Sequence, residues 1–248
     1  MWTLPTVFMC ILMVLAVLGT AAKARETFSV VETKTQLDVY DEPYARIYDL
    51  VTYDHLRTEQ EVAVVVNLAT EESRVLDVGC GLGHYVSQLR RKGVDAVGLD
   101  AAPAMVKGAR AKYPECSFEE GNALFRHRFA GESFTHILCL NNTLLDMKHK
   151  NLFFENAHFW LEPGGFLVAH LNDDLLLLKK RANTRANFEY TSAMVGNTLY
   201  ETFRGPSKVR RNEHRYYTEP TQLLVDMVKQ AGFVVFSTNS NLYVFQKS

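Results

Sequence analysis

Three glycines at alternate positions mark the part of the chain best suited to binding a ligand. They stand in VLDVGCGLGHY, residues 75–85, where an apolar run contains Asp77 and leads to Gly79, Gly81 and Gly83. A strand that passes through a glycine turn into a helix brings the backbone close to a ligand and points helix N–H groups at it. The spacing therefore predicts a ligand-binding turn.

A second carboxylate narrows the chemistry of that ligand. Asp100 ends the next apolar run, 23 residues after Asp77, where a carboxylate can accept hydrogen bonds from both hydroxyls of an adenosine ribose. Asp100 could also cap the helix expected to begin at Pro103, and one residue can do both. The dinucleotide fingerprint Gly-x-Gly-x-x-Gly requires glycine at position 84, where the chain has His84; this argues against an NAD-dependent oxidoreductase.

The elements that must position these residues are short apolar segments separated by helical patterns. The expected strands cover residues 74–78, 94–100, 116–119, 134–140, 166–171, 233–238 and 242–246. Helix signals include a capping box of Thr58 and Glu61, Pro103 at a helix start, and apolar periodicity over 153–160 and 220–231. Strands that alternate with helices predict a parallel sheet covered on both faces, and the last two strands predict a closing hairpin.

These motifs resemble those of the class I S-adenosylmethionine-dependent methyltransferases, over residues 40–171 by motif and to residue 248 by architecture. The similar segments include GNA at 121–123, FTHILCLNNTL at 134–144 and LEPGGFLVAHLND at 161–173. The resemblance implies an α/β fold with a Rossmann-like, doubly wound, seven-stranded sheet that is mostly parallel and has an antiparallel last strand. Within the family, the fourth and fifth strands are most similar to those of glycine-type small-molecule N-methyltransferases.

The resemblance also implies S-adenosylmethionine as the cofactor and indicates its binding residues. They are Asp77, Gly79, Gly81, Gly83, Asp100, Ala101, Asn122, Ala123, Leu140 and Asn141. The glycine motif would hold the methionine part, Asp100 the ribose, and Ala101 and Asn122 the adenine. The family usually has Asp where this chain has Asn122, so we expect looser binding without charge assistance. No metal is expected, because no His/Cys cluster has ligand spacing.

Methyl transfer from a sulfonium depends mainly on how the acceptor is aligned with the methyl group. A general base is needed only when the nucleophile arrives protonated. The candidates for a base or an orienting group are His84, Asn141, His170 and His214, and no catalytic residue is assigned. For each histidine a structural role is the alternative. Tyr44 and Tyr48 could close over the cofactor as a lid or pack in the core. Asn141-Asn142 replaces the (Asn/Asp)-Pro-Pro-aromatic box of base-methylating enzymes, which argues against nucleic acid as substrate.

Residues 172–217 read as an irregular insertion on the substrate side. They hold nine basic residues and five acidic ones, whereas the rest of the chain has 18 basic and 23 acidic. The basic residues are Lys179, Lys180, Arg181, Arg185, Arg204, Lys208, Arg210, Arg211 and Arg215. Such a stretch could capture an anionic substrate or lie on anionic lipid headgroups. Alternatively, it is a solvated face whose arginine stems cover apolar surface.

Residues 1–22 contain no charged side chain and are followed by Lys23 and Arg25. This length is sufficient for a membrane span, and the positive charges after it predict that the following domain faces the cytosol. The alternative is a cleaved signal peptide with an A-x-A site at 22–24 and a secretory location. Residues 23–42 are then a linker, and 43–248 form the methyltransferase domain.

The composition is that of a folded chain, with 47% hydrophobic and 22% charged residues. A net charge of −1 provides no overall field to attract nucleic acid. The four cysteines (Cys10, Cys80, Cys116 and Cys139) form no CxxC pair and are expected to be reduced thiols. The leading hypothesis is a methyltransferase acting on a small or lipid-like molecule at a membrane face. The alternatives are a non-catalytic, membrane-tethered cofactor-binding module and, less favoured, an NAD-dependent oxidoreductase.

Overall fold

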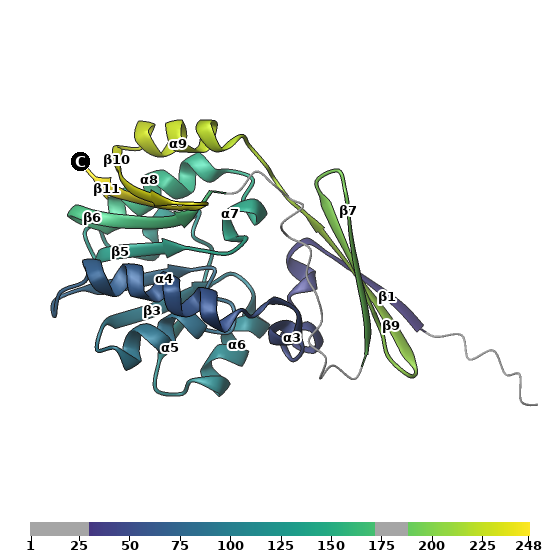
Figure 1. Cartoon of the computed structure of the whole chain (residues 1–248). Coiled ribbons are helices and arrows are strands. Elements are labelled where there is room, and N and C mark those ends of the chain that lie inside the picture. Colours follow the sequence, from purple (N-terminus) through teal and green to yellow (C-terminus); the bar gives the residue numbers. More distant parts are fainter. Residues whose placement is uncertain (1–29, 172–187) are drawn as a thin grey trace, which may run out of the picture.

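The computed structural model describes residues 30–171 and 188–248, which form a seven-stranded sheet covered by helices and a separate four-stranded sheet (Figure 1). The predicted anchor or signal segment at 1–22 lies outside the described residues. Four of the basic residues of the predicted insertion also lie outside them, namely Lys179, Lys180, Arg181 and Arg185. Within the two described ranges, no helix is long and apolar enough to cross a membrane.

The seven-stranded sheet has β5 in the middle and a hairpin at one edge. In spatial order its strands are β10 (Phe233–Asn239), β11 (Leu242–Lys247), β6 (Leu161–His170), β5 (Phe134–Cys139), β2 (Arg74–Val78), β3 (Asp95–Asp100) and β4 (Ser117–Glu120). β11 is antiparallel to both of its neighbours, and all other adjacent pairs are parallel. The predicted mostly parallel sheet with an antiparallel last strand is therefore confirmed.

Helices cover both faces of this sheet. α4 (His55–Leu68), α5 (His84–Arg91) and α6 (Pro103–Lys112) pack on one face, against side chains such as Val75 and Leu138. α8 (Lys150–Trp160) and α9 (Thr221–Gln230) pack on the other face, against side chains such as Leu76 and Ile137. Successive residues of β2 and β5 thus enter two different cores, which explains why apolar residues occur next to one another in both strands.

Two local predictions on these elements are wrong. The predicted capping box is absent, because α4 begins at His55 and the carboxylate of Asp54 accepts the hydrogen bond from the Arg57 N–H (3.1 Å). Thr58 lies inside the helix, where its hydroxyl donates to the carbonyl of Asp54 (2.7 Å), and the Glu61 side chain is turned into the protein. β6 begins at Leu161, earlier than the expected residue 166.

The four-stranded sheet occupies chain that was expected to be irregular. Its order is β1 (Val30–Thr35), β9 (Lys208–Arg215), β8 (Thr198–Arg204) and β7 (Glu189–Val195), with β1 parallel to β9 and the other pairs antiparallel. The predicted linker is therefore wrong for residues 30–35, and the predicted irregular stretch is wrong for 189–215. The physical reason is that several of the positions that face inward are polar, so the strands show no apolar alternation.

Short helical segments lie between the two sheets (Figure 1). They are η1 (Gln36–Val39), α2 (Glu42–Ala45), α3 (Tyr48–Thr52) and, after β5, α7 (Thr143–Asp146), while η2 (Arg126–Arg128) lies between β4 and β5. The segment that follows β9 is connected to the part of the molecule that holds the large sheet, because the Tyr217 N–H donates to the carbonyl of Leu145 in α7 (2.8 Å). The four-stranded sheet is thereby held over the carboxyl ends of the central strands.

Candidate functional site

The glycine turn lies between β2 and α5, at the carboxyl end of the sheet. Gly79, Gly81 and Gly83 all have positive φ angles, at +71°, +54° and +81°. A side chain at Gly79 would overlap the Thr143 side chain, and one at Gly83 would overlap the ring of Phe118. The turn therefore requires glycine for its backbone conformation and for the close approach of its neighbours. Helix α5 begins directly after Gly83, so its first N–H groups lie at this turn.

Two carboxylates face the glycine turn, the partly buried Asp100 and the buried Asp77. Asp100 at the end of β3 accepts hydrogen bonds from the N–H groups of Gly81 (2.8 Å) and Ala102 (2.9 Å). Asp77 is only 2% exposed, and its Oδ2 has no hydrogen-bond partner among the described residues. Burial, and to a smaller extent the charge of Asp100, raises the pKa of Asp77 to about 7. A ligand with a hydrogen-bond donor at this point would satisfy a costly buried oxygen.

The remaining cofactor-site residues of the sequence prediction lie at the ends of neighbouring strands. The Gly121 N–H donates to the carbonyl of Asp100 (2.9 Å), which brings Asn122 and Ala123 beside Asp100 and Ala101. Asn122 is exposed, and its Oδ1 accepts from the Leu124 N–H (2.9 Å). Leu140 is buried and Asn141 exposed directly after β5. The structure thus gathers the whole predicted set at the carboxyl ends of β2, β3, β4 and β5.

Two of the candidate bases, His84 and His170, are engaged at both ring nitrogens by protein groups. His84 stacks on Tyr53 (3.8 Å between centroids), with its Nε2 2.8 Å from Asp49 and its Nδ1 2.9 Å from the Tyr113 hydroxyl. The Nδ1 of His170 accepts a hydrogen bond from the Asn141 N–H, and its Nε2 lies 3.0 Å from Glu61. For these two histidines the structural interpretation holds.

A cluster of aromatic rings fills the space between the four-stranded sheet and the glycine turn. This tyrosine cluster consists of Tyr40, Tyr44, Tyr48 and Tyr216 together with His214. Tyr44 is fully buried and packs in the core, so the lid alternative does not apply to it. Tyr48 contacts the turn itself, since a side chain at Gly81 would lie 3.7 Å from its ring.

Carboxylates surround the tyrosine cluster. Glu201, fully buried on β8, lies 2.6 Å from the Nε2 of His214 and accepts hydrogen bonds from the hydroxyls of Tyr44 and Tyr190 (both 2.8 Å). The Tyr40 hydroxyl donates to Asp146 of α7 (3.0 Å). Burial raises the pKa of Tyr48, and the charges of Asp100, Asp146 and Glu201 raise it further. Carboxylates from three separate elements therefore act on one phenol. The sequence showed no signal for Tyr40, Asp146 or Glu201.

The basic residues of the predicted insertion do not form one solvated face. Arg210 is 6% exposed, and its Nη1 lies 2.8 and 3.0 Å from the two carboxylate oxygens of Asp41, while its Nη2 donates to the carbonyl of Val39 (2.8 Å). The expectation that Arg210 meets solvent or substrate is therefore wrong. Arg211 and Arg215, on the same strand, are exposed.

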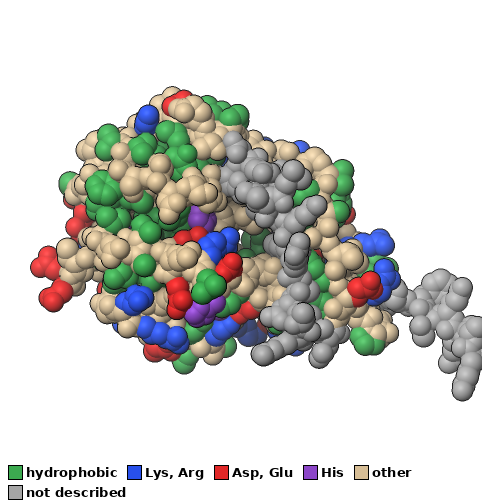
Figure 2. All heavy atoms as spheres, in the orientation of Figure 1, with side chains coloured by type: hydrophobic (Ala, Val, Ile, Leu, Met, Phe, Trp, Pro, Cys, Tyr) green, Lys and Arg blue, Asp and Glu red, His purple; other side chains and the backbone are tan. Residues whose placement is uncertain are grey.

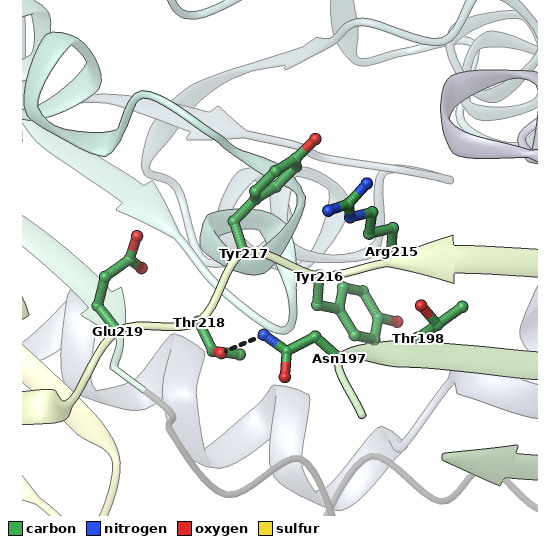
Figure 3. A pocket seen from close by; sticks show the side chains of 7 residues that line it. All are labelled: Asn197, Thr198, Arg215, Tyr216, Tyr217, Thr218 and Glu219. Atoms are coloured by element: carbon green, nitrogen blue, oxygen red, sulfur yellow. Dashed lines mark hydrogen bonds between the residues drawn. The ribbon is translucent and has the colours of Figure 1, made fainter. Parts of the chain in front are cut away.

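A surface pocket of about 560 Å³ lies where β9 leads toward α9 (Figure 3). It is lined by Asn197, Thr198, Arg215, Tyr216, Tyr217, Thr218 and Glu219. Its volume is in the range of small-molecule sites. Tyr216 belongs both to this pocket and to the tyrosine cluster. Figure 2 shows acidic, basic and histidine side chains gathered near the middle of the visible face.

Comparison with known proteins finds similarity in the part of the chain that carries the glycine turn. Residues 75–165 match a family model described as a methyltransferase domain. The dTDP-3-amino-3,4,6-trideoxy-alpha-D-glucopyranose N,N-dimethyltransferase of Streptomyces venezuelae is 28% identical over 138 residues, covering 52% of this chain and 57% of that protein. The trans-aconitate 2-methyltransferase of Methylobacterium radiotolerans is 26% identical over 126 residues, covering 50% of this chain and 47% of that protein. The chain thus spans about half the length of these curated relatives.

A solved structure supports the fold assignment. The amino pentose methyltransferase CalS10 of Micromonospora echinaspora, solved with S-adenosylmethionine bound, superposes with a TM-score of 0.56 and 18% identity. The match covers 79% of this chain and 98% of that one. At this identity the likeness concerns the fold, which includes the sheet that carries the glycine turn.

Proposed function

Because the chain belongs to the class I S-adenosylmethionine-dependent methyltransferase family, we propose that it binds this cofactor at the glycine turn and methylates a small molecule. When bound, the cofactor supplies a methyl group that its sulfonium has already activated. The chain then has to bind the cofactor, align the acceptor and exclude water. The observation that carries the proposal is the unpartnered, buried oxygen of Asp77 beside three glycines in left-handed conformations.

The residues at the turn fit this cofactor. The ammonium group of its methionine part can supply the donor that Asp77 Oδ2 lacks, and an ionised Asp77 would strengthen that hydrogen bond. Each Asp100 oxygen accepts one backbone N–H and retains a second lone pair for a ribose hydroxyl. Asn122 at the end of β4 is exposed and can meet the adenine edge. These roles are proposals for the residues that the sequence indicated.

For the acceptor we propose a small molecule with a nucleophilic nitrogen, bound beside the tyrosine cluster. Phenols and carboxylates, which bind amines through hydrogen bonds and ring faces, make up the walls of the cluster around Tyr48. His214, 2.6 Å from Glu201, is a histidine that could take the proton from an amine. The Streptomyces venezuelae relative is named for an amino sugar, whereas trans-aconitate in the other name is a carboxylic acid. A carboxylate acceptor is therefore the second candidate.

Transfer of a labelled methyl group tests the proposal. The full chain should be incubated with methyl-labelled S-adenosylmethionine and two matched panels, one of amino sugars and small amines and one of di- and tricarboxylic acids. Label transferred to amines supports the proposed acceptor class, and label transferred only to acids replaces it with the second candidate. Cofactor binding without transfer to either panel or to a metabolite extract would instead support the non-catalytic module.

We also propose that residues 1–22 hold the domain at a membrane facing the cytosol, where a lipid-like or anionic acceptor could meet it. The support is the uncharged run followed by Lys23 and Arg25, together with the exposed Arg211 and Arg215. N-terminal sequencing of the mature protein that begins at Arg25 would reject the tether. The tether would also be rejected if the domain were protected from protease that is added outside sealed vesicles whose cytosolic side faces outward.

A further inference from the structure

Four residues form a closed ring of contacts at the end of β5. This group, called here the Asn141 ring, comprises Arg57 and Glu61 on α4, His170 at the end of β6, and Asn141. The Asn141 N–H donates to the Nδ1 of His170 (2.7 Å), and the Nε2 of His170 lies 3.0 Å from Glu61. Arg57 closes the ring, since its Nε lies 3.6 Å from Glu61 and its Nη2 donates to the side-chain oxygen of Asn141.

The contacts assign the tautomer of His170. Its Nδ1 accepts a backbone N–H and therefore carries no proton in this arrangement. The proton must then lie on Nε2, which donates it to the carboxylate of Glu61. Both side chains are nearly inaccessible, at 5% exposure for His170 and 7% for Glu61, so the buried Nε2–H of His170 depends on Glu61 for its acceptor.

What the ring holds in place is a backbone conformation of Asn141 that few residues adopt. Asn141 has φ of +55°, in the left-handed region, where Asn is among the few non-glycine residues tolerated. Cys139 of β5 pairs in parallel with Ala169 of β6, so His170 lies beside the residues that follow β5. The imidazole of His170 can therefore reach the Asn141 N–H. The fixed turn continues into Thr143, whose side chain occupies the space that a side chain at Gly79 would need.

We propose that Glu61 and His170 are positioning residues that fix the turn at Leu140–Asn141 against the glycine turn, and thereby preform the cofactor site. The proposal rests on the proposed function for the identity of the cofactor. Neither residue needs to touch the cofactor, because His170 acts through the main chain of Asn141. The charge of Arg57 keeps the side-chain oxygen of Asn141 directed toward α4, which leaves the amide of its side chain for the site.

Two substitutions at position 170 separate this role from simple packing. In His170→Asn the side-chain oxygen is attached to Cγ, as Nδ1 is, so the acceptor for the Asn141 N–H is kept. In His170→Gln the amide is attached one bond further out, where it replaces Nε2 as the donor to Glu61. The acceptor for the Asn141 N–H is then lost. Tyr85→Phe is the matched control, because Tyr85 donates to Oε2 of Glu61, whereas His170 lies against Oε1.

The experiment has a spectroscopic part and a binding part, both on the full chain. Nitrogen-15 NMR of the wild type should show the Nε2–H tautomer of His170 and an exchange-protected Asn141 amide, and this protection should persist in His170→Asn but not in His170→Gln. In calorimetric titrations, His170→Gln should bind S-adenosylmethionine about tenfold more weakly than wild type, roughly the effect of one hydrogen bond. His170→Asn should stay within about threefold and Tyr85→Phe should match wild type.

Equal affinities of His170→Asn and His170→Gln, or a proton on Nδ1 of His170 in the wild type, would overturn the proposal. These outcomes differ from failure of the proposed function. If the wild type gives no heat with S-adenosylmethionine, the cofactor assignment fails, and the tautomer and amide protection still decide whether the ring positions Asn141.

Discussion

Replacing Asp77 by Asn should stabilise the unliganded protein at alkaline pH while weakening its proposed function. Burial raises the pKa of Asp77 from 3.8 to about 7, so the native protein binds this proton more tightly than the unfolded chain does. The stabilisation is then fully present below pH 3.8 and is lost as the pH rises through 7. The difference between these two pKa values corresponds to about 4 kcal/mol of unfolding free energy.

Asn is neutral at every pH, so Asp77→Asn removes this pH dependence. The buried Asn amide lacks an acceptor at the position of Oδ2, which costs about 1–3 kcal/mol at all pH values. The difference in unfolding free energy between the variant and the wild type should therefore shift in favour of the variant by about 2–3 kcal/mol from pH 5 to pH 8. At pH 8 the variant should be at least as stable as the wild type.

Urea unfolding of both proteins without cofactor, followed by circular dichroism at pH 5, 6, 7 and 8, measures this difference. Calorimetry at pH 8 should show weaker S-adenosylmethionine binding by the variant, since the charged acceptor is gone. A stability difference that does not change with pH would refute the reasoning about Asp77. A variant that binds the cofactor as tightly as wild type would separate Asp77 from the site.

Four further substitutions, one of them a control, test other parts of the structure. Asp100→Ala should weaken S-adenosylmethionine binding by about 1–3 kcal/mol, because ribose hydroxyls lose a carboxylate acceptor; calorimetry showing unchanged affinity would remove Asp100 from the site. Arg210→Gln should lower the urea unfolding free energy by about 3 kcal/mol, because Asp41 loses its buried partner. Arg211→Gln, at an exposed position of the same strand, should change it by less than about 0.5 kcal/mol, and equal losses would contradict the structural role of Arg210. Asn122→Asp should tighten cofactor binding modestly in the same calorimetric assay, since charged acceptors form stronger hydrogen bonds; weaker binding would place Asn122 away from the adenine edge.

The seven-stranded sheet could be predicted because its signals are local. β2 and β5 are covered on both faces, so most side chains in them are apolar, and the strand bounds follow closely from the sequence. The glycines after β2 are equally visible, since only glycine suits three positive φ angles in succession at this spacing. These two features were enough to place the carboxyl ends of the strands and the turn.

The four-stranded sheet could not be predicted because its inner face is partly polar. Glu201, Asn212 and His214 are buried on β8 and β9, and their burial is compensated by partners distant in the chain, such as Tyr44. Polar residues of this kind are normally predicted to be exposed. For the same reason Arg210 looked like part of a solvated basic face, although Asp41, far earlier in the chain, holds it inside.

The finer features of the site also depend on contacts between distant segments. Glu61 has the spacing of a capping residue after Thr58, but its carboxylate is turned toward Tyr85 and His170. The unpartnered oxygen of Asp77 and the left-handed backbone of Asn141 appear only once the strands are packed together. Residue types at the site were thus predictable, whereas their hydrogen bonding was not.

The central claim is that the glycine turn is a site for S-adenosylmethionine, and competition calorimetry on the full chain tests it most directly. The titration would follow S-adenosylmethionine alone, then with S-adenosylhomocysteine or NAD⁺ as competitor. We predict saturable binding of S-adenosylmethionine that S-adenosylhomocysteine abolishes and NAD⁺ leaves unchanged. Binding of NAD⁺ with no heat from S-adenosylmethionine would contradict the account.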